Sequence, residues 1–303
     1  MTLSKATDPL PKIPGFELEK ELGRGGMGVV YQARQIDPPR PVALKVLRPK
    51  ADPVVFARLL AEAEALARLR HPNVVEVYGI GEYAGRPYLI MEFCDGSNLQ
   101  NHLLGQPQPP RAAAELTATL ARAVQHFHGL GVIHRDLKPA NILLAGSVPK
   151  IADFGLAKLL VGEMHLTQSG AVLGSVGYMS PEQAKGGTKH VGPAADIWAL
   201  GCILYSLLTG DPPFQGMMDL ETLTAIVEHD PPPPPGPPEL VGICMKCLRK
   251  QPDERHATAG ALADDLDRWL RGEPVRLDAD RSSEPVVERR GWLSSLLGRR
   301  AAE

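Results

Sequence analysis

The spacing of apolar residues changes part-way along this chain, and that change constrains the fold more than any other feature. Up to residue 93, short runs that alternate apolar and polar side chains indicate half-buried strands, and one stripe at 54–70 has helical spacing. After Gly96 the spacing is helical. The strands are expected at 16–22, 29–34, 41–47, 74–78 and 87–93, and the later helices at 112–130, 196–208, 220–228, 240–248 and 257–270.

A sheet-rich first part followed by a helix-rich second part predicts an α+β protein with two lobes. We expect a small N-terminal lobe, residues 16–93, built from an antiparallel sheet with one helix. A larger, mostly helical C-terminal lobe should follow over residues 94–271, with the boundary near Phe93 to Gly96.

The segments outside and between these lobes have no periodic apolar pattern. Residues 1–15 are expected to form a flexible arm, and residues 272–303 a polar, flexible tail whose short apolar stripe at 292–297 could instead dock on the domain or on a membrane. The proline-rich run at 230–238 is interpreted as an extended linker between helices, with a ligand for a proline-binding module as the alternative.

Composition excludes several classes of protein. The 33 basic and 35 acidic residues give a net charge of −2, which argues against a protein that coats nucleic acid. Four cysteines are too few for a disulfide scaffold, and the chain opens without a charged-then-apolar leader. The longest apolar stretch, around 198–208, is too short to span a membrane. A cytoplasmic protein without an integral membrane segment is therefore expected.

A glycine-rich segment from Gly23 to Val30 (GRGGMGVV) contains the pattern Gly-x-Gly-x-x-Gly-x-Val. A dinucleotide-binding fold would need a helix after these glycines, but a β-branched, alternating segment follows instead. The glycines therefore lie at a hairpin tip, where backbone N–H groups can approach a phosphate chain closely.

Two residues on the third expected strand share one face. Ala43 and Lys45 are two positions apart, so a small apolar group and a cation can meet an adenine ring and its phosphates. Glu62 lies on the apolar stripe of the expected helix, where a carboxylate needs a cationic partner, whereas Glu64 faces solvent. We expect a Lys45–Glu62 ion pair that orients the ammonium group toward phosphate; a solvent-exposed lysine is the alternative.

The motif from His134 to Asn141 (HRDLKPAN) precedes Asp153-Phe154-Gly155, with two short strands between them. A hairpin centred on Ser147 would place Asn141 opposite Asp153, so that two oxygen ligands meet, as magnesium prefers. Asp136 is placed to accept a proton from an incoming hydroxyl group, and Lys138 to steady a transferred phosphoryl group.

At this point the sequence resembles the bacterial, eukaryotic-like (Hanks-type) serine/threonine protein kinases. The resemblance covers about residues 16–270, with the motifs in the family's order, and it implies a bilobal protein kinase fold over residues 16–271. The matching segments are Gly23 to Val30, Val42 to Lys45, His134 to Asn141, Asp153-Phe154-Gly155, Ser180-Pro181-Glu182 and Asp196 to Gly201.

The resemblance also implies roles for single residues. Met91 would be the gatekeeper beside the adenine, and the backbone of Glu92 and Cys94 would meet the ring. Glu182 would pair with Arg255, and Asp196 would anchor the catalytic loop. The expected ATP-binding set is Leu22, Gly23, Arg24, Gly25, Gly26, Met27, Gly28, Val29, Val30, Ala43, Lys45, Glu62, Met91, Glu92 and Cys94, with Asn141 and Asp153 as the magnesium ligands.

Two departures from the family pattern lie between Asp153-Phe154-Gly155 and the helix expected at 196–208. Ser180 stands where alanine is usual, and Ser175 where threonine is usual. Both changes keep the small size or the hydroxyl group, so activity is expected to remain. Lys138 follows the serine/threonine type of catalytic loop.

The predicted activity is ATP- and magnesium-dependent transfer of the γ-phosphoryl group to serine or threonine hydroxyls of protein substrates. A pseudokinase that binds nucleotide as a scaffold is the alternative, although pseudokinases commonly lack one of Lys45, Asp136, Asn141 or Asp153 and all four are present. A small-molecule phosphotransferase would lack the Ser-Pro-Glu segment.

Three further sets of residues complete the prediction. Thr167 and Ser169 lie in a segment without periodic apolar residues, and a phosphate there could pair with Arg135, beside Asp136, so autophosphorylation is expected, with a transient dimer as one route. Cys244 and Cys247 have zinc-type spacing but no second ligand pair, which favours helix packing. The two histidines of the first long helix, His126 and His128, are expected to be structural.

Overall fold

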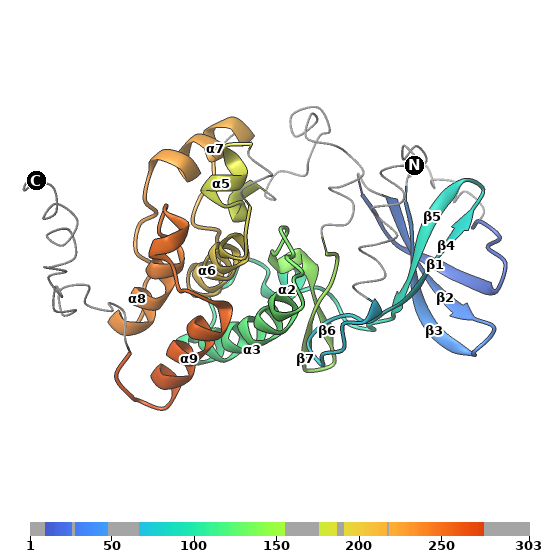
Figure 1. The fold of residues 1–303 in the computed structure, drawn as a ribbon, viewed down its shortest axis with the longest axis horizontal. Coiled ribbons are helices and arrows are strands. Elements are labelled where there is room, and N and C mark those ends of the chain that lie inside the picture. Colours follow the sequence, from blue (N-terminus) through green and yellow to red (C-terminus); the bar gives the residue numbers. More distant parts are fainter. Residues whose placement is uncertain are drawn as a thin grey trace, which may run out of the picture.

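The computed structural model describes residues 10–25, 28–47, 67–154, 176–186, 191–216 and 218–275. Figure 1 shows a twisted sheet at one end of the molecule and a group of helices at the other, joined by the chain after the last strand of the sheet. The expected α+β architecture with two lobes is confirmed.

The N-terminal sheet has five antiparallel strands in the order β1-β2-β3-β5-β4. The alternation of their side chains gives the sheet two apolar faces. Val42, Leu44 and Val46 point to one face, and Ala43 and Leu47 point to the other. The strands are β1 (Phe16–Gly25), β2 (Gly28–Gln35), β3 (Arg40–Leu47), β4 (Val77–Tyr83) and β5 (Arg86–Glu92).

Residues just before β1 take part in this packing. Ile13 is only 2% exposed and lies in the same cluster as Val42 and Leu44. The turn to β1 is held by hydrogen bonds from Phe16 N–H to Ile13 and from Ile36 N–H to Gly15. Within the expected flexible arm, therefore, Ile13 packs on the sheet; a single apolar residue between prolines leaves no periodic signal in the sequence.

The fourth strand begins later than its sequence pattern predicts. β4 starts at Val77, whereas Val74 forms an isolated parallel bridge with Ile151 of the helical lobe. Val75 N–H also donates to Ile151 O at 2.8 Å. The expected strand at 74–78 is thus divided: its first half pairs across the two lobes and its second half begins β4.

The C-terminal lobe is built around one buried helix, α6, which packs against α3, α8 and α9. All but its first and last residues are buried. The helices are α2 (Leu99–Leu103), α3 (Pro110–Gly129), α5 (Pro181–Ala184), α6 (Ala194–Thr209), α7 (Asp219–Glu228), α8 (Pro238–Cys247) and α9 (Ala259–Leu270). Every helix expected from the sequence after Gly96 is present; of the one expected at 54–70, only residues 67–70 are described.

The proline-rich segment connects α7 to α8 without regular secondary structure. Pro231 and Pro234 are buried, while the prolines between them are exposed. A spacing of three matches the three-residue turn of a polyproline II helix, so one edge of the segment packs on the lobe.

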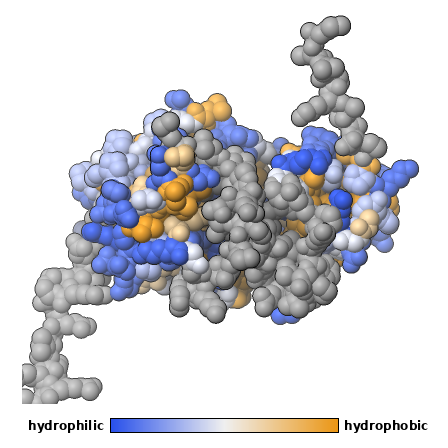
Figure 2. Space-filling model, turned by 90° about the horizontal axis from the view of Figure 1, so that it is seen from above, coloured by the Kyte–Doolittle hydropathy of each residue, from blue (hydrophilic) through white to orange (hydrophobic). Residues whose placement is uncertain are grey.

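The surface seen from above is largely hydrophilic over both lobes, with apolar patches of which the broadest lies on the helical lobe (Figure 2). The exposed large apolar side chains include Met218 and Leu220 at the start of α7, which are 60% and 71% exposed. In the described part of the chain, no helix combines the length and apolar character that a membrane span requires.

Candidate active site

One face of the sheet carries several of the expected nucleotide-binding side chains. On β3, Ala43 and Lys45 are 8% and 9% exposed. Ala43 pairs with Met91 of β5, and Lys45 pairs with Val30 of β2. Because directly paired residues project to the same face, these four side chains line one surface, and the shared face of Ala43 and Lys45 is the one that their spacing predicts.

The glycine-rich segment forms the end of the β1–β2 hairpin, where Gly25 pairs with Gly28. Gly28 has a φ of +155°, and a Cβ there would lie 2.2 Å from the carbonyl oxygen of Val46, so only glycine fits. At Gly23 and Gly25 a Cβ would meet nothing within 4 Å. The fold itself therefore does not require glycine at these two positions, which suits close approach by a ligand. Gly26 and Met27 lie outside the described residues.

Lys45 reaches across to the helical lobe. Its Nζ lies 2.7 Å from Oδ1 of Asp153, the expected metal ligand. The Lys45 side chain is 11% exposed and that of Asp153 39%. Glu62 and Glu64 lie outside the described residues, so the Lys45–Glu62 pair stays a prediction.

The hairpin before Asp153 has a different register from the one predicted. β6 (Ile142–Ala145) pairs with β7 (Val148–Ile151) so that Ile142 faces Ile151, and Asn141 O accepts from Ala152 N–H. The turn has two residues and Gly146 has a φ of +60°, as a two-residue hairpin turn with glycine first requires. The expected centre at Ser147 was therefore wrong by half a residue, and Asn141 lies beside Ala152 rather than opposite Asp153.

The catalytic-loop residues are nevertheless brought together. The amide Nδ2 of Asn141 donates to the backbone oxygen of Asp136 at 2.8 Å and to its Oδ2 at 3.1 Å. Lys138 Nζ lies 3.1 Å from the same Oδ2. Since both partners of Nδ2 are acceptors, the Asn141 amide is fixed with its oxygen pointing away from Asp136.

A buried carboxylate holds the backbone just before Asp136. Asp196, at the start of α6, is 0% exposed and accepts hydrogen bonds from the N–H groups of His134 and Arg135, both at 2.8 Å. His128 Nε2 lies 2.8 Å from the same carboxylate. The expected anchoring role of Asp196 and the structural role of His128 both agree with these contacts.

His134 links the catalytic loop to the strand end before Asp153. Its Nδ1 accepts from Asp136 N–H at 3.2 Å, so its Nε2 carries the proton and donates to Ala152 O at 2.9 Å. Burial lowers the pKa of His134 in spite of the carboxylate of Asp196 nearby, which keeps the ring neutral. Arg135, which follows His134, and Asp153, which follows Ala152, both have positive φ, +63° and +58°.

A second ion pair joins the lobes at the expected hinge. Glu92 Oε1 lies 2.9 Å from Lys150 Nζ on β7, and Glu92 Oε2 accepts from Glu76 N–H at 3.3 Å. The resemblance implies a role only for the backbone of Glu92, and the sequence gives no sign of this ion pair. Opposite charges on two short strands far apart in sequence give no local signal.

The implied pair between Glu182 and Arg255 is present and bidentate. Arg255 Nη1 and Nη2 donate to the two carboxylate oxygens of Glu182, both at 2.8 Å, and its guanidinium also lies 5.1 Å from the centre of the Trp198 ring. Burial alone would raise the pKa of Glu182, but the hydrogen bonds and charge of Arg255 outweigh it and lower this pKa. The pair is thus ionised and ties α5 to the helical lobe.

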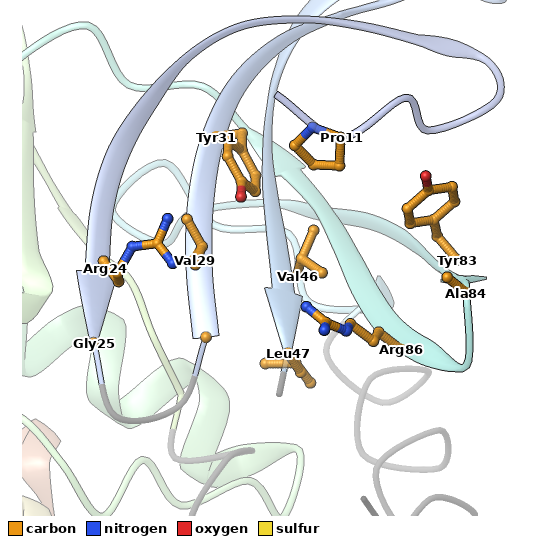
Figure 3. A pocket seen from close by; sticks show the side chains of 11 residues that line it. Pro11, Arg24, Gly25, Val29, Tyr31, Val46, Leu47, Tyr83, Ala84 and Arg86 are labelled. Carbon is orange, nitrogen blue, oxygen red and sulfur yellow. The ribbon is translucent and has the colours of Figure 1, made fainter. Parts of the chain in front are cut away.

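The structure also contains a cavity of about 550 Å³ (Figure 3). It is lined by Arg24, Val29, Tyr31, Val46, Tyr83 and Arg86, among others. Val29, Tyr31 and Val46 alternate with Val30 and Lys45 along their strands, so this cavity lies on the face of the sheet opposite Lys45. Arg24 and Val29, expected to bind ATP, turn their side chains to that opposite face, and only their backbone can border the nucleotide.

Several expected residues fall outside the described part of the chain: Gly155, Thr167, Ser169 and Ser175. Within the described residues, no group of three or more histidine, cysteine, aspartate or glutamate side chains is arranged to hold a metal ion. Cys244 donates to Gly201 O, and Cys247 lies 3.4 Å from His256. Both cysteines pack inside the helical lobe.

The N-terminal lobe is a five-stranded antiparallel sheet with a glycine hairpin and a buried lysine. It is set against a helical lobe in which one loop brings an aspartate, a lysine and an asparagine together. These features define a protein kinase fold. The protein kinase domain family matches residues 16–266. The chain belongs to this family, in its bacterial Hanks-type serine/threonine branch.

Named relatives agree with this assignment. The chain is 41% identical over 286 residues to the serine/threonine-protein kinase PknB of Mycobacterium leprae, covering 88% of this chain and 46% of the relative. It is 40% identical over 288 residues to PknB of Mycobacterium tuberculosis, with the same coverage of 88% and 46%. It is 38% identical over 306 residues to the serine/threonine-protein kinase Pkn1 of Myxococcus xanthus, covering 94% of this chain and 43% of the relative. The chain thus spans about half the length of these relatives.

Proposed function

We propose that this chain is an ATP- and Mg²⁺-dependent protein kinase that phosphorylates serine and threonine hydroxyls of protein substrates. The observation that carries the proposal is the clustering of Asp136, Lys138 and Asn141 within hydrogen-bond distance of one another. Asp136 has the one carboxylate in this cluster, and its Oδ2 is steadied by an ammonium and an amide.

In the proposed reaction, Asp136 accepts the proton of the substrate hydroxyl as that oxygen attacks the γ-phosphorus. A new oxygen–phosphorus bond forms, the bond between the γ-phosphorus and the bridging oxygen breaks, and ADP leaves with the electron pair. Lys138 neutralises charge on the transferred phosphoryl group, and Lys45 does so on the remaining phosphates.

The residues present fit a magnesium ion. Asp153 offers a carboxylate that is partly exposed, and Asn141 presents its amide oxygen because its nitrogen is engaged by Asp136. Magnesium is typically held by one or two protein oxygens, with phosphate and water completing the shell. Bound there, the ion would neutralise the phosphate charges. Asp153 now pairs with Lys45, which would move to the phosphates when nucleotide binds.

The ATP site proper would lie on the face of Val30, Ala43 and Met91, under the glycine hairpin, with Leu22 at its rim and the backbone of Glu92 and Cys94 along the adenine edge. The small side chain of Ala43 leaves room for a flat ring beside Met91.

The four free cysteines support the expectation that the domain works in a reducing, cytoplasmic environment.

The proposal includes autophosphorylation on Thr167 or Ser169. A phosphate carries about −1.5 to −2 charges near neutral pH and would form charge-assisted hydrogen bonds with the guanidinium of Arg135. Arg135 directly precedes Asp136, so such a contact would act next to the reacting group.

One variant tests both the phosphoryl transfer to substrates and the autophosphorylation. Asp136→Asn should reduce transfer of radiolabelled phosphate to a peptide by about 10²- to 10⁴-fold, because the proton acceptor is lost, while ATP affinity stays within about twofold. Mass spectrometry of the peptide with Thr167 and Ser169 should show phosphate in the wild type but not in the variant. A wild type that binds ATP yet transfers nothing would favour the pseudokinase alternative.

A further inference from the structure

The peptide bond between Arg135 and Asp136 is held at both ends. Its N–H, on Asp136, donates to His134 Nδ1 at 3.2 Å, and its carbonyl, on Arg135, accepts from Gln183 Nε2 at 2.8 Å. Arg135 has a φ of +63°, a conformation that costs free energy for a residue with a side chain. The orientation of this peptide decides where the side chain of Asp136 points.

The two side chains that hydrogen-bond to this peptide come from different parts of the chain. His134 is buried and belongs to the catalytic loop itself, whereas Gln183 is half-buried and lies on α5, 48 residues after Arg135. The same α5 carries Glu182, whose pair with Arg255 fixes it to the helical lobe. Gln183 is therefore a direct link from the firmly anchored α5 to the backbone beside Asp136.

The Gln183 amide is oriented by its own neighbours. Its Oε1 accepts from the N–H of Ser180 at 3.1 Å and from the Ser180 hydroxyl at 3.2 Å. This part of the arrangement is a helix cap, which a glutamate at the same position would also provide. With the oxygen committed to Ser180, the nitrogen is the group left to donate to Arg135 O.

We infer that Gln183 is a positioning residue for the phosphoryl transfer: its N–H donor holds the Arg135 carbonyl and so orients Asp136. The inference rests on the proposed function and adds a residue that acts through the backbone rather than on the substrate. It separates two roles of one side chain, an acceptor role in the helix cap and a donor role in the catalytic loop.

Two substitutions distinguish these roles. Gln183→Glu keeps the length and the cap acceptor but places a carboxylate oxygen against the Arg135 carbonyl, while Gln183→Met removes both donor and acceptor. If the donor role is correct, both variants should lose about tenfold in kcat with KM for ATP within twofold, and Gln183→Glu should lose at least as much as Gln183→Met. If only the cap matters, Gln183→Glu should behave like the wild type.

A matched control is Gln125→Met in α3. Gln125 is also half-buried, and its Oε1 accepts from Gly260 N–H at 2.9 Å, away from the catalytic loop. It should leave kcat and both KM values within twofold. Should Gln183→Met fail to fold in a thermal melt, the isosteric Gln183→Glu still decides the question.

Two results would overturn the inference. One is a Gln183→Glu enzyme that keeps more than half of the wild-type kcat, and the other is a loss confined to KM for ATP. A wild type without any transfer activity would instead overturn the proposed function, so the two failures are distinguishable.

Discussion

The two lobes hold their parts of the candidate site in different ways. In the N-terminal lobe, Lys45 and Ala43 are placed by strand pairing and by apolar packing on both faces of the sheet. In the C-terminal lobe, Asp136 is placed by a chain of polar groups that includes the buried Asp196 and His134.

This difference follows from what each half has to do. Strand pairing fixes backbone position but leaves a lysine side chain free to exchange partners, as a phosphate-binding group must. A buried polar network fixes the direction of a single carboxylate, because every group that lacks its partner costs free energy inside the protein. The C-terminal half should therefore be rigid, and the N-terminal half should adapt to the nucleotide.

The largest effect on stability should come from breaking the C-terminal network. Arg255→Met leaves Glu182 half-buried without its cation, and it also removes donors from the carbonyls of Arg249 and Ala194. Removing one partner of such a pair costs about 3–5 kcal/mol, which lowers the melting temperature by about 6–20 °C in a domain of this size. The melting temperature is measured by thermal unfolding, with circular dichroism as the signal.

The control is Arg271→Met, which breaks an exposed arginine–glutamate pair with Glu273. Exposed pairs contribute little, so its melting temperature should match the wild type within about 1 °C. Equal melting temperatures for Arg255→Met and Arg271→Met would contradict the special role of the C-terminal network.

The pKa of Glu182 is lowered in the folded state, so the Arg255 pair stabilises the protein at neutral pH, and this contribution is lost as the pH falls through that pKa.

Removing the charge of Lys45 in the N-terminal lobe should lower activity and leave stability almost unchanged. Lys45→Met removes the cation expected at the phosphates, so phosphate transfer should fall by about 10²- to 10³-fold. Its partner Asp153 is 39% exposed, and water can replace the lost contact, so the melting temperature should change by less than about 3 °C. Steady-state kinetics and thermal melts on the same samples give both numbers.

Lys150→Met serves as the matched lysine variant. It removes a second ion pair between the lobes, with Glu92, whose side chain lies on the face of the sheet opposite Ala43 and Lys45. Activity should therefore fall much less than in Lys45→Met. Comparable losses in the two variants would mean that any contact between the lobes matters equally, and that Lys45 has no special place at the phosphates.

Sequence reasoning succeeded where the signal was local. The five helices expected after Gly96 carry apolar stripes, and each appears within a few residues of its expected range, whereas the short α2 and α5 were not predicted. The face shared by Ala43 and Lys45 follows from the period of two along a strand. The Glu182–Arg255 and Asp196 contacts came from family resemblance, and the structure contains both.

It failed where position depends on a turn or on a distant partner. The β6–β7 register shifted because glycine at 146 allows a two-residue turn, which the alternation of four-residue strands cannot decide. Val74 pairs with Ile151 rather than continuing β4, since a strand pattern does not reveal its partner. Gln183 gave no signal because a helix cap already accounts for its residue type.

The smallest predicted effect concerns the cysteines, which lie at the boundary and inside the C-terminal lobe. Cys94 is partly exposed at the expected adenine edge, whereas Cys202, Cys244 and Cys247 are buried. Burial, with the charge of Glu92 adding to it, raises the pKa of Cys94 to about 11. Near pH 8 it is almost wholly a thiol, so it should react with a disulfide reagent about 20-fold more slowly than free cysteine.

The folded protein should therefore release one equivalent of reporter slowly, with a rate that rises toward pH 11, and three more only after unfolding. Saturating ATP with magnesium should slow the first equivalent further, because Cys94 would then border the adenine; Cys94→Ala should abolish that slow phase. Rapid reaction of one thiol at pH 8 would contradict the raised pKa of Cys94. Fast reaction of all four thiols in the folded protein would show that the helical lobe opens more readily than its buried network implies.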